Sequence, residues 1–253
     1  MTATVALHHR TDGPPAAPVV VLVHAIGTSL QAWAPQAAAL SRDFRVVSVD
    51  LRGHGRSPVP PGPYTIAGLA ADVIALLDVL GIERASVCGL SLGGMVGLTL
   101  AAVAPDRVDR LVAACVTAVP PVPSAWEDRA QRVLAGGSSA VADLVVERWG
   151  YRDRAPEIAE LVRGMLAVTP AAGYAGCCQA IAAMDLRPVL PLVSAPTLLL
   201  AGSEDPAAPA QVARELSAAM PDASVHVIDG AAHLLNIEAA AATTAAILEH
   251  LRR

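Results

Sequence analysis

The segment Gly89-Leu90-Ser91-Leu92-Gly93 lies between two apolar stretches of different character. Residues 85–88 form a run typical of a buried strand, whereas residues 94–104 are apolar and mostly small, as in a packed helix. Glycine on each side of Ser91 permits a turn that leaves no room for a neighbouring side chain. The segment therefore predicts a strand that turns sharply into a helix and exposes the Ser91 hydroxyl.

A hydroxyl at such a turn is suited to nucleophilic chemistry, because the positive end of the following helix favours negative charge beside it. The pattern G-x-S-x-G is short and also occurs in ordinary glycine-rich loops. Its place between a strand-like run and a helix-like run makes it informative, and Ser91 is our candidate nucleophile.

Strand-like and helix-like segments alternate along most of the chain. Strands are expected over residues 4–9, 19–23, 44–49, 85–88, 108–116, 196–201 and 224–228. Helices are expected over residues 33–40, 66–80, 94–104, 209–220 and 237–251, with Thr65 capping the second and Gly81 ending it. This order predicts an α/β fold with a mostly parallel central sheet flanked by helices.

The stretch from residue 119 to residue 191 breaks this alternation. It begins with Val119-Pro120-Pro121-Val122-Pro123, contains helix-like segments and has no convincing core strand. We expect a core domain from residues 1–118 and 192–253, with residues 119–191 inserted as a helical cap or lid. Ordinary packing helices are the alternative, but an insertion at the sheet end where ligands bind favours a cap.

Composition narrows the class of protein. The 253 residues are 54% hydrophobic and 16% charged, which suffices for a sizeable core and argues against disorder. No uninterrupted apolar stretch reaches about 20 residues, so we expect no membrane span. A net charge of −5 without a basic cluster argues against a nucleic-acid partner. Met1-Thr2-Ala3-Thr4 lacks the features of a signal peptide, so we expect a cytoplasmic protein.

The cysteines and histidines show no metal-binding pattern. Cys88, Cys115, Cys177 and Cys178 have neither a disulfide framework nor zinc-ligand spacing, and we expect them to be packed core residues in a reducing compartment. The sequence predicts neither a metal site nor a cofactor.

A serine nucleophile needs a base, and the base needs an acidic partner that orients it. Asp205 follows the expected strand 196–201, and His233 follows the expected strand 224–228. The chain order serine, acid, histidine is one of the known arrangements, and all three residues come after strands of one parallel sheet. We therefore expect Ser91, Asp205 and His233 to form a catalytic triad.

Two other residues compete for these roles. Glu204 is an alternative acid, but Asp205 has the preferred position within its motif. His226 is an alternative base, but it lies inside an expected strand. Taken singly, Asp205 could also be a turn residue before a proline, and His233 an ordinary loop histidine.

Attack on an ester carbonyl also needs donors for the developing oxyanion. One donor is expected to be the backbone N–H of Leu92, directly after the nucleophile. The other is expected to be the N–H of Ile26, in the loop after the strand 19–23. We expect His24 and His54 to organise the surrounding loops rather than to take part in catalysis.

Several segments together resemble the α/β-hydrolase superfamily, over essentially the whole chain. They are residues 24–28, 50–57, 89–93, 202–205 and the loop of His233. A narrower resemblance, to 3-oxoadipate enol-lactonases, rests on residues 62–66, 88–95, 126–129, 148–149, 173–178, 180–181, 185–187 and 231–238. The segments in the expected cap are the most informative, because caps vary most with substrate.

This resemblance implies a serine hydrolase that opens the enol-lactone of the β-ketoadipate pathway of aromatic catabolism. The implied partner is a small anionic lactone or ester, whose carboxylate needs a cationic or hydrogen-bonding group. Trp126, Arg129 and Trp149 are our candidates for binding it, although packing tryptophans and a solvent-facing arginine are the alternatives.

Other functions on the same scaffold stay open. They are a carboxylesterase, a lactonase for another ring, a lyase, a cyclase, a cofactor-free peroxidase and a binding module. An ordered triad argues against a pure binding role but does not separate hydrolysis from the lyase class, since one fold hosts many reactions.

Overall fold

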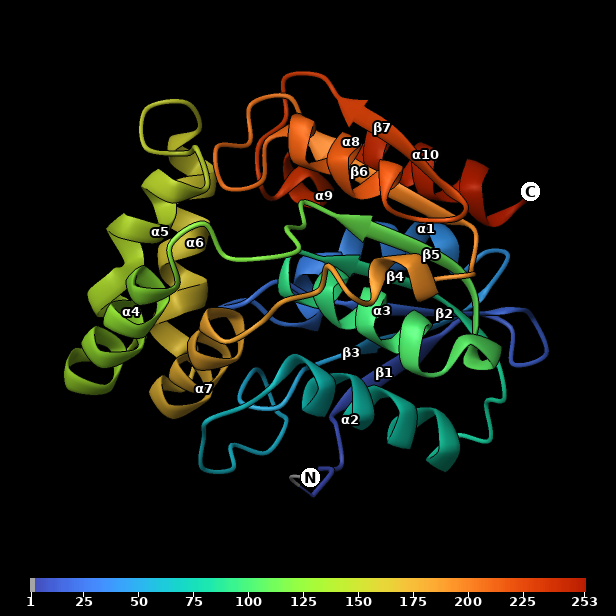
Figure 1. Ribbon diagram of the computed structural model, residues 1–253, viewed down its shortest axis with the longest axis horizontal. Helices are drawn as coiled ribbons and strands as arrows, with labels where there is room; N and C mark the ends of the chain where they lie inside the picture. Colours follow the sequence, from blue (N-terminus) through green and yellow to red (C-terminus); the bar gives the residue numbers. More distant parts are fainter. Residues whose placement is uncertain (1–2) are drawn as a thin grey trace.

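The computed structural model of the protein describes residues 3–253, and its centre is a seven-stranded sheet (Figure 1). The strand order is β1-β3-β2-β4-β5-β6-β7. β1 runs antiparallel to β3, and all other pairs are parallel. The predicted α/β fold is confirmed. Met1 and Thr2, which belong to the segment used in the signal-peptide argument, lie outside the described residues.

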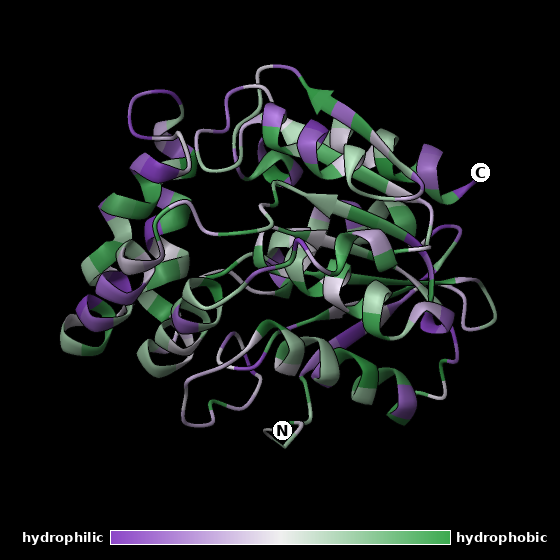
Figure 2. Cartoon of the chain, in the orientation of Figure 1, coloured by the Kyte–Doolittle hydropathy of each residue, from purple (hydrophilic) through white to green (hydrophobic). Residues whose placement is uncertain are grey.

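The positions of the strands agree with the apolar runs in the sequence, except for the first strand. They are β1 (His9–Asp12), β2 (Val19–Val23), β3 (Arg45–Val49), β4 (Ala85–Leu90), β5 (Val108–Ala114), β6 (Thr197–Gly202) and β7 (Ala223–Ile228). β4 and β6 are buried along their whole length, as expected for parallel strands with both faces covered. Figure 2 shows hydrophobic residues concentrated in these central strands.

The prediction of a strand over residues 4–9 was wrong, because the strand covers His9–Asp12. Two N–H groups of the backbone before it bond to side chains instead of to another strand. The Val5 N–H donates to Asp72 at 2.9 Å, and the His8 N–H donates to the Ser57 hydroxyl at 2.8 Å.

Helices cover both faces of the sheet. The α-helices are α1 (Ala34–Leu40), α2 (Ile66–Val79), α3 (Leu92–Val103), α4 (Pro123–Gly136), α5 (Ala142–Arg148), α6 (Pro156–Val168), α7 (Ala171–Ala182), α8 (Ala210–Ala218), α9 (Leu235–Glu238) and α10 (Ala240–Leu251). The 3₁₀ turns are η1 (Leu30–Trp33), η2 (Pro105–Arg107), η3 (Ser138–Val141) and η4 (Leu190–Leu192). α1 packs with α10, and α2 packs with α3.

The predicted helix ends are confirmed at α2 and corrected at the C-terminus. Thr65 caps α2 by accepting the Gly68 N–H at 3.0 Å, and Gly81 has a left-handed φ of 64°. The single helix expected over residues 237–251 is two helices, α9 and α10, which are separated at Ala239.

Residues 119–191 contain helices and no strand, as predicted. α4 to α7 lie together beyond one end of the sheet, at the left of Figure 1. α4 packs closely on α7. Their role as a lid, and the domain boundaries at 119 and 191, stay predictions.

No single helix in residues 3–253 has the length and apolarity to cross a bilayer. α6 and α7 have the required length and apolarity only when they are taken together, and a bend of 108° separates them.

Candidate active site

The turn around Ser91 has the geometry that the sequence predicts. β4 ends at Leu90 and α3 begins at Leu92, while Ser91 has φ 52° and ψ −114°. Few non-glycine residues adopt this conformation, which costs about 1–3 kcal/mol and persists only where the surroundings impose it. Here the Ser91 N–H donates to Ala114 at 2.7 Å, and its carbonyl accepts the Met95 N–H at 2.9 Å.

The two glycines of the turn permit close contact between backbones. A Cβ at Gly89 would lie 2.2 Å from the Gly93 carbonyl oxygen. A Cβ at Gly93 would lie 2.1 Å from the carbonyl oxygen of Val23, in β2. Both distances are far below van der Waals contact, so any side chain at either position requires the backbone to move.

Asp205 and His233 meet at the carboxyl ends of β6 and β7. The Oδ2 atom of Asp205 lies 2.8 Å from Nδ1 of His233, and both side chains are buried. The other carboxylate oxygen of Asp205 accepts the N–H groups of Ala207 at 2.8 Å and Ala208 at 3.2 Å.

These contacts keep Asp205 ionised. Burial opposes its ionisation, but attraction to His233, the hydrogen bond between them and the two N–H donors outweigh burial and lower the pKa of Asp205. An ionised Asp205 orients the His233 ring with Nδ1 toward the carboxylate, which leaves Nε2 for proton transfer.

Ser91 and His233 both line one narrow cavity, together with Cys115, Trp126 and Trp149. The structure thus brings Asp205 and His233 into direct contact and exposes Ser91 and His233 to a common space. No hydrogen bond joins the side chains of Ser91 and His233 in the described chain. Catalytic hydrogen bonds are often long in ligand-free enzymes and tighten when substrate binds.

The two competing residues lie elsewhere. Glu204 is exposed beside Asp205, where its carboxylate accepts a bond from the Ser203 hydroxyl at 3.3 Å. His226 is exposed within β7, so its predicted place in a strand is confirmed.

The two predicted oxyanion donors come from neighbouring segments, because Gly93 near the start of α3 lies against the backbone of Val23 and His24 at the end of β2. Leu92 is the first residue of α3, and Ile26 lies in the loop after β2. The next residue after Ile26, Gly27, has a left-handed φ of 74° and donates its N–H to Nε2 of His54 at 2.9 Å. This bond fixes the loop that contains Ile26.

His24 and His54 have the architectural roles that the sequence predicts. The His24 Nε2 accepts the Leu51 N–H at 3.0 Å, while its Nδ1 contacts the Ala25 carbonyl at 2.7 Å. Burial lowers the pKa of both histidines, to about 3 for His54. Both rings are therefore neutral at neutral pH, as acceptance of a backbone N–H at Nε2 requires.

Two of the three predicted binding residues reach the cavity of Ser91. Trp126 and Trp149 line it, and the Trp149 ring is stacked on the His233 ring with centroids 5.1 Å apart. Arg129 lies behind Trp126, with its guanidinium 4.4 Å from the Trp126 ring centroid. Its side chain is buried, and Nε and Nη1 have no hydrogen-bond partner.

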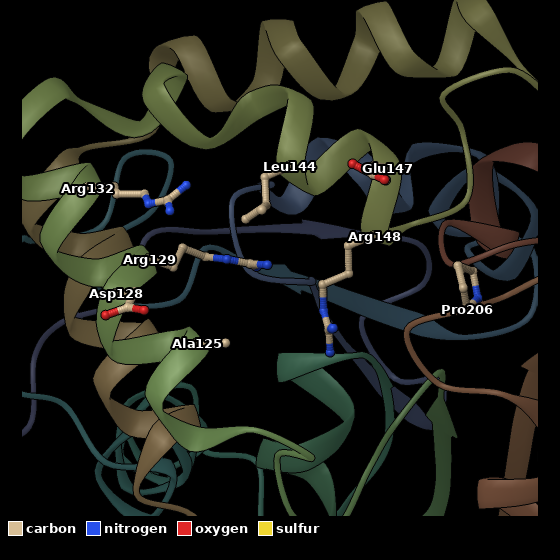
Figure 3. Close-up of a pocket in the computed structure, with 8 residues that line it drawn as sticks. All are labelled: Ala125, Asp128, Arg129, Arg132, Leu144, Glu147, Arg148 and Pro206. Atoms are coloured by element: carbon tan, nitrogen blue, oxygen red, sulfur yellow. The ribbon is translucent and has the colours of Figure 1, made fainter.

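Arg148, at the end of α5, is a cavity residue that we did not predict. It lines the cavity of Ser91 and also the adjoining one of about 560 Å³, which Arg129 lines too. Figure 3 shows the side chains of Arg129 and Arg148 extending toward the same space. Burial, followed by repulsion from Arg129, lowers the pKa of Arg148.

Neither of these arginines forms an ion pair within residues 3–253. The acidic neighbour of Arg148 in the sequence, Glu147, contacts Arg152 instead, at 2.6 Å. Two buried or half-buried cations without a counter-ion create a site suited to an anion. Arg148 ends α5 directly before Trp149, and this pair is one of the segments that resemble enol-lactonases.

The four cysteines are free and buried, as expected of packing residues. Cys115 nevertheless lies near the active site: its sulfur and one ligand atom each of Asp205 and His233 are within 4.8 Å of one another. The sequence does not predict this grouping. Burial and the Asp205 charge raise the pKa of the Cys115 thiol, and Asp205 and His233 already bind each other, so the donor set suits no metal ion.

Comparison with known proteins agrees with the fold. Residues 18–148 and 140–240 match the family described as the alpha/beta hydrolase fold. The protein named 3-oxoadipate enol-lactonase 2, from Acinetobacter baylyi, is 38% identical over 237 residues, which are 92% of this chain and 88% of that protein.

Solved structures give the same result. The enol-lactonase of Burkholderia xenovorans LB400 superposes with a TM-score of 0.93 and 42% identity, over 98% of this chain and 96% of that one. A thermophilic esterase from Thermogutta terrifontis, with malate bound, gives a TM-score of 0.90 and 32% identity, over 97% and 93% of the two chains. The chain therefore belongs to the alpha/beta hydrolase fold family and is a hydrolytic enzyme, similar to 3-oxoadipate enol-lactonases.

Proposed function

We propose that this enzyme hydrolyses a small enol-lactone that carries a free carboxylate, through an acyl-enzyme on Ser91. The observation that carries the proposal is a single cavity lined by Ser91, by a His233 ring bonded to Asp205, and by the unpaired cation of Arg148. The names of the similar enol-lactonases from Acinetobacter baylyi and Burkholderia xenovorans support the same substrate class.

In the first half of the reaction, His233 removes the hydroxyl proton of Ser91 through Nε2, and the serine oxygen attacks the lactone carbonyl. The N–H groups of Leu92 and Ile26 stabilise the oxyanion. When the tetrahedral intermediate collapses, the ring C–O bond breaks and His233 returns the proton to the leaving oxygen. The leaving group is an enol, which tautomerises to a ketone and makes the ring opening favourable.

In the second half, His233 takes a proton from water, and the resulting hydroxide attacks the acyl-enzyme. Collapse of the second intermediate breaks the ester bond to Ser91, which recovers its proton from His233. Asp205 stays ionised throughout and stabilises the imidazolium form of His233, in agreement with its lowered pKa.

Arg148 and Arg129 are the groups that bind the substrate carboxylate in this proposal. Guanidinium groups form paired, charge-assisted hydrogen bonds with carboxylates, and these two have no competing acidic partner. The Trp126 ring lies within 4.4 Å of the Arg129 guanidinium and 5.6 Å of the Arg148 guanidinium, which limits the positions that the two cations adopt.

The first test replaces the nucleophile by Ser91→Ala. The backbone bonds of residue 91 do not involve its hydroxyl, so the variant is expected to fold with an unchanged thermal midpoint. Enol-lactone turnover should fall by at least about a thousandfold, the scale of nucleophile removal in other serine hydrolases. A fluorophosphonate should label the parent protein and not the variant. Turnover within tenfold of the parent would contradict the proposal.

Simple ester hydrolysis is the second candidate, favoured by the 32% identity to the Thermogutta terrifontis esterase. The two candidates predict different substrate preferences. A carboxylate-bearing enol-lactone should be hydrolysed with a higher kcat/KM than neutral esters of similar size. A preference for the neutral esters would favour the carboxylesterase.

A further inference from the structure

His233 lies in the loop of residues 230–234, and the backbone on each side of it bonds to a side chain outside the loop. The Ala232 N–H donates to Oε2 of Glu238 at 2.7 Å. The Leu234 N–H donates to the hydroxyl of Tyr151 at 2.7 Å. Two hydrogen bonds therefore hold the backbone immediately before and after His233, and neither bond involves the His233 side chain.

Tyr151 and Glu238 also bind each other. The Tyr151 hydroxyl donates to Oε2 of Glu238 at 3.2 Å, so Tyr151 accepts one hydrogen bond and donates one. A phenol has a single proton to donate, and a carboxyl oxygen has two lone pairs, so Oε2 of Glu238 accepts from both Tyr151 and Ala232. Arg154 forms an ion pair with the other oxygen of Glu238.

The tyrosine comes from the segment Trp149–Arg154, directly after α5, and this whole segment lies against the loop of His233. Arg154 donates to the Gly230 carbonyl at 2.7 Å. The Trp149 ring is stacked on the His233 ring, and the Trp149 carbonyl lies 3.5 Å from the His233 N–H. Residues of the helical insertion thus contact the loop at its beginning, its middle and its end.

We propose that Tyr151 and Glu238 are positioning residues for His233, and that the segment Trp149–Arg154 must be docked on the 230–234 loop for the base to reach its working position. The proposal rests on the proposed role of His233 as the base. It makes the α5 end of the insertion part of the catalytic machinery, in addition to its contribution to the cavity wall.

The position of His233 matters because proton transfer tolerates only a small displacement of the base. Tyr151 and Leu234 are fully buried, so loss of the phenol oxygen leaves the Leu234 N–H without a partner and without water. The loop then shifts to find an acceptor. A displacement of about 1 Å at a catalytic group costs roughly a hundredfold in rate.

The experiment compares Tyr151→Phe with a matched control, Tyr64→Phe. The Tyr64 hydroxyl is a similar group, on a side chain that is 2% exposed, and it donates to the Pro60 carbonyl at 2.7 Å away from the His233 loop. Both variants should lose a similar amount of thermal stability. Tyr151→Phe should lower kcat about ten- to a hundredfold with KM within about threefold, and Tyr64→Phe should leave kcat unchanged.

Glu238 supplies a second, independent pair of variants. Glu238→Gln retains an oxygen that accepts the Ala232 N–H, whereas Glu238→Ala does not. The expected order of kcat is parent, then Glu238→Gln, then Glu238→Ala, so that the conservative variant partly restores the rate. If Tyr151→Phe fails to fold, this pair still decides the question.

A proton NMR signal gives a readout that general destabilisation does not change. The proton between Nδ1 of His233 and Asp205 should give a strongly deshielded resonance in the parent and in Tyr64→Phe. It should be broadened or lost in Tyr151→Phe. An unchanged kcat and an unchanged resonance in Tyr151→Phe would overturn the positioning role. Activity retained in Ser91→Ala would instead overturn the proposed function, so the two failures are distinguishable.

Discussion

In the proposed function, the charges of Arg129 and Arg148 account for the selection of an anionic ester. A buried cation without a counter-ion is unfavourable to the fold, and Arg129 has two nitrogen atoms without any hydrogen-bond partner. Binding a carboxylate relieves this cost at the moment of complex formation. Under this proposal, the site loses some stability and gains affinity for its substrate, as functional sites commonly do.

We predict that Arg129→Ala and Arg148→Ala each raise KM for an anionic lactone about tenfold or more, which corresponds to the 1.5–3 kcal/mol typical of a charged hydrogen bond. The KM for a neutral ester should change by less than about twofold. Arg163→Ala is the control, because Arg163 is also in the insertion but is paired with Asp143 and Glu160 at the surface. Equal effects on both substrates would remove these arginines from the binding site.

The limits of sequence interpretation are visible at these same residues. The contact between Asp205 and His233 was predictable because each residue follows an apolar strand and their chain order matches a known arrangement. Arg148 was not, because its importance depends on lacking an acidic partner. The absence of an acidic partner for Arg148 is visible only in the folded chain, where its neighbour Glu147 pairs with Arg152.

Among the elements, the β4–α3 turn was predicted most closely, because its structural requirement appears directly in the sequence as two glycines. β2 was predictable for a similar reason, since burial on both faces produces an unbroken apolar run. β1 was misplaced because the backbone of Val5 bonds to Asp72, a contact across 67 positions that leaves no local signal. The break at Ala239 lies in an alanine-rich run that has no glycine or proline to mark it.

The turn itself is testable with two glycine substitutions of opposite expected sign. Gly93→Ala places a Cβ 2.1 Å from a backbone oxygen of β2, so we expect a loss of more than about 3 kcal/mol of stability together with activity. Gly164→Ala, at an exposed position of α6 with no atom near its Cβ, should instead gain about 0.5–1 kcal/mol. Urea denaturation measures both changes. A Gly93→Ala protein as stable as the parent would show that the close β2–α3 approach is not required.

At the scale of the whole molecule, topology explains how distant residues meet. β4, β5, β6 and β7 are parallel neighbours, so the loops that carry Ser91, Asp205 and His233 all leave the same edge of the sheet. The insertion after β5 begins at that edge as well. A parallel sheet with one long insertion therefore places Ser91 and the Asp205-bonded His233 at the same cavity as Trp126, Arg148 and Trp149 of the insertion.

The pH dependence of folding is also a property of the whole molecule, and it follows from the buried histidines His24 and His54, whose ring centroids lie 5.2 Å apart. Burial lowers the pKa of both, to about 3 for His54, whereas an unfolded chain has a histidine pKa near 6.5. Between these values the unfolded state binds more protons than the folded state. The free energy of unfolding must therefore fall as the pH drops below about 6.5.

For His54 alone, this linkage amounts to about 2 kcal/mol between pH 7 and pH 5. We predict that urea denaturation at the two pH values shows at least this loss for the parent protein, because His24 adds to it in the same direction. His54→Gln keeps an oxygen that accepts the Gly27 N–H but cannot bind a proton, so its stability should fall less than that of the parent over the same interval. Identical pH dependence in the two proteins would mean that the His54 ring is not the source of the acid sensitivity.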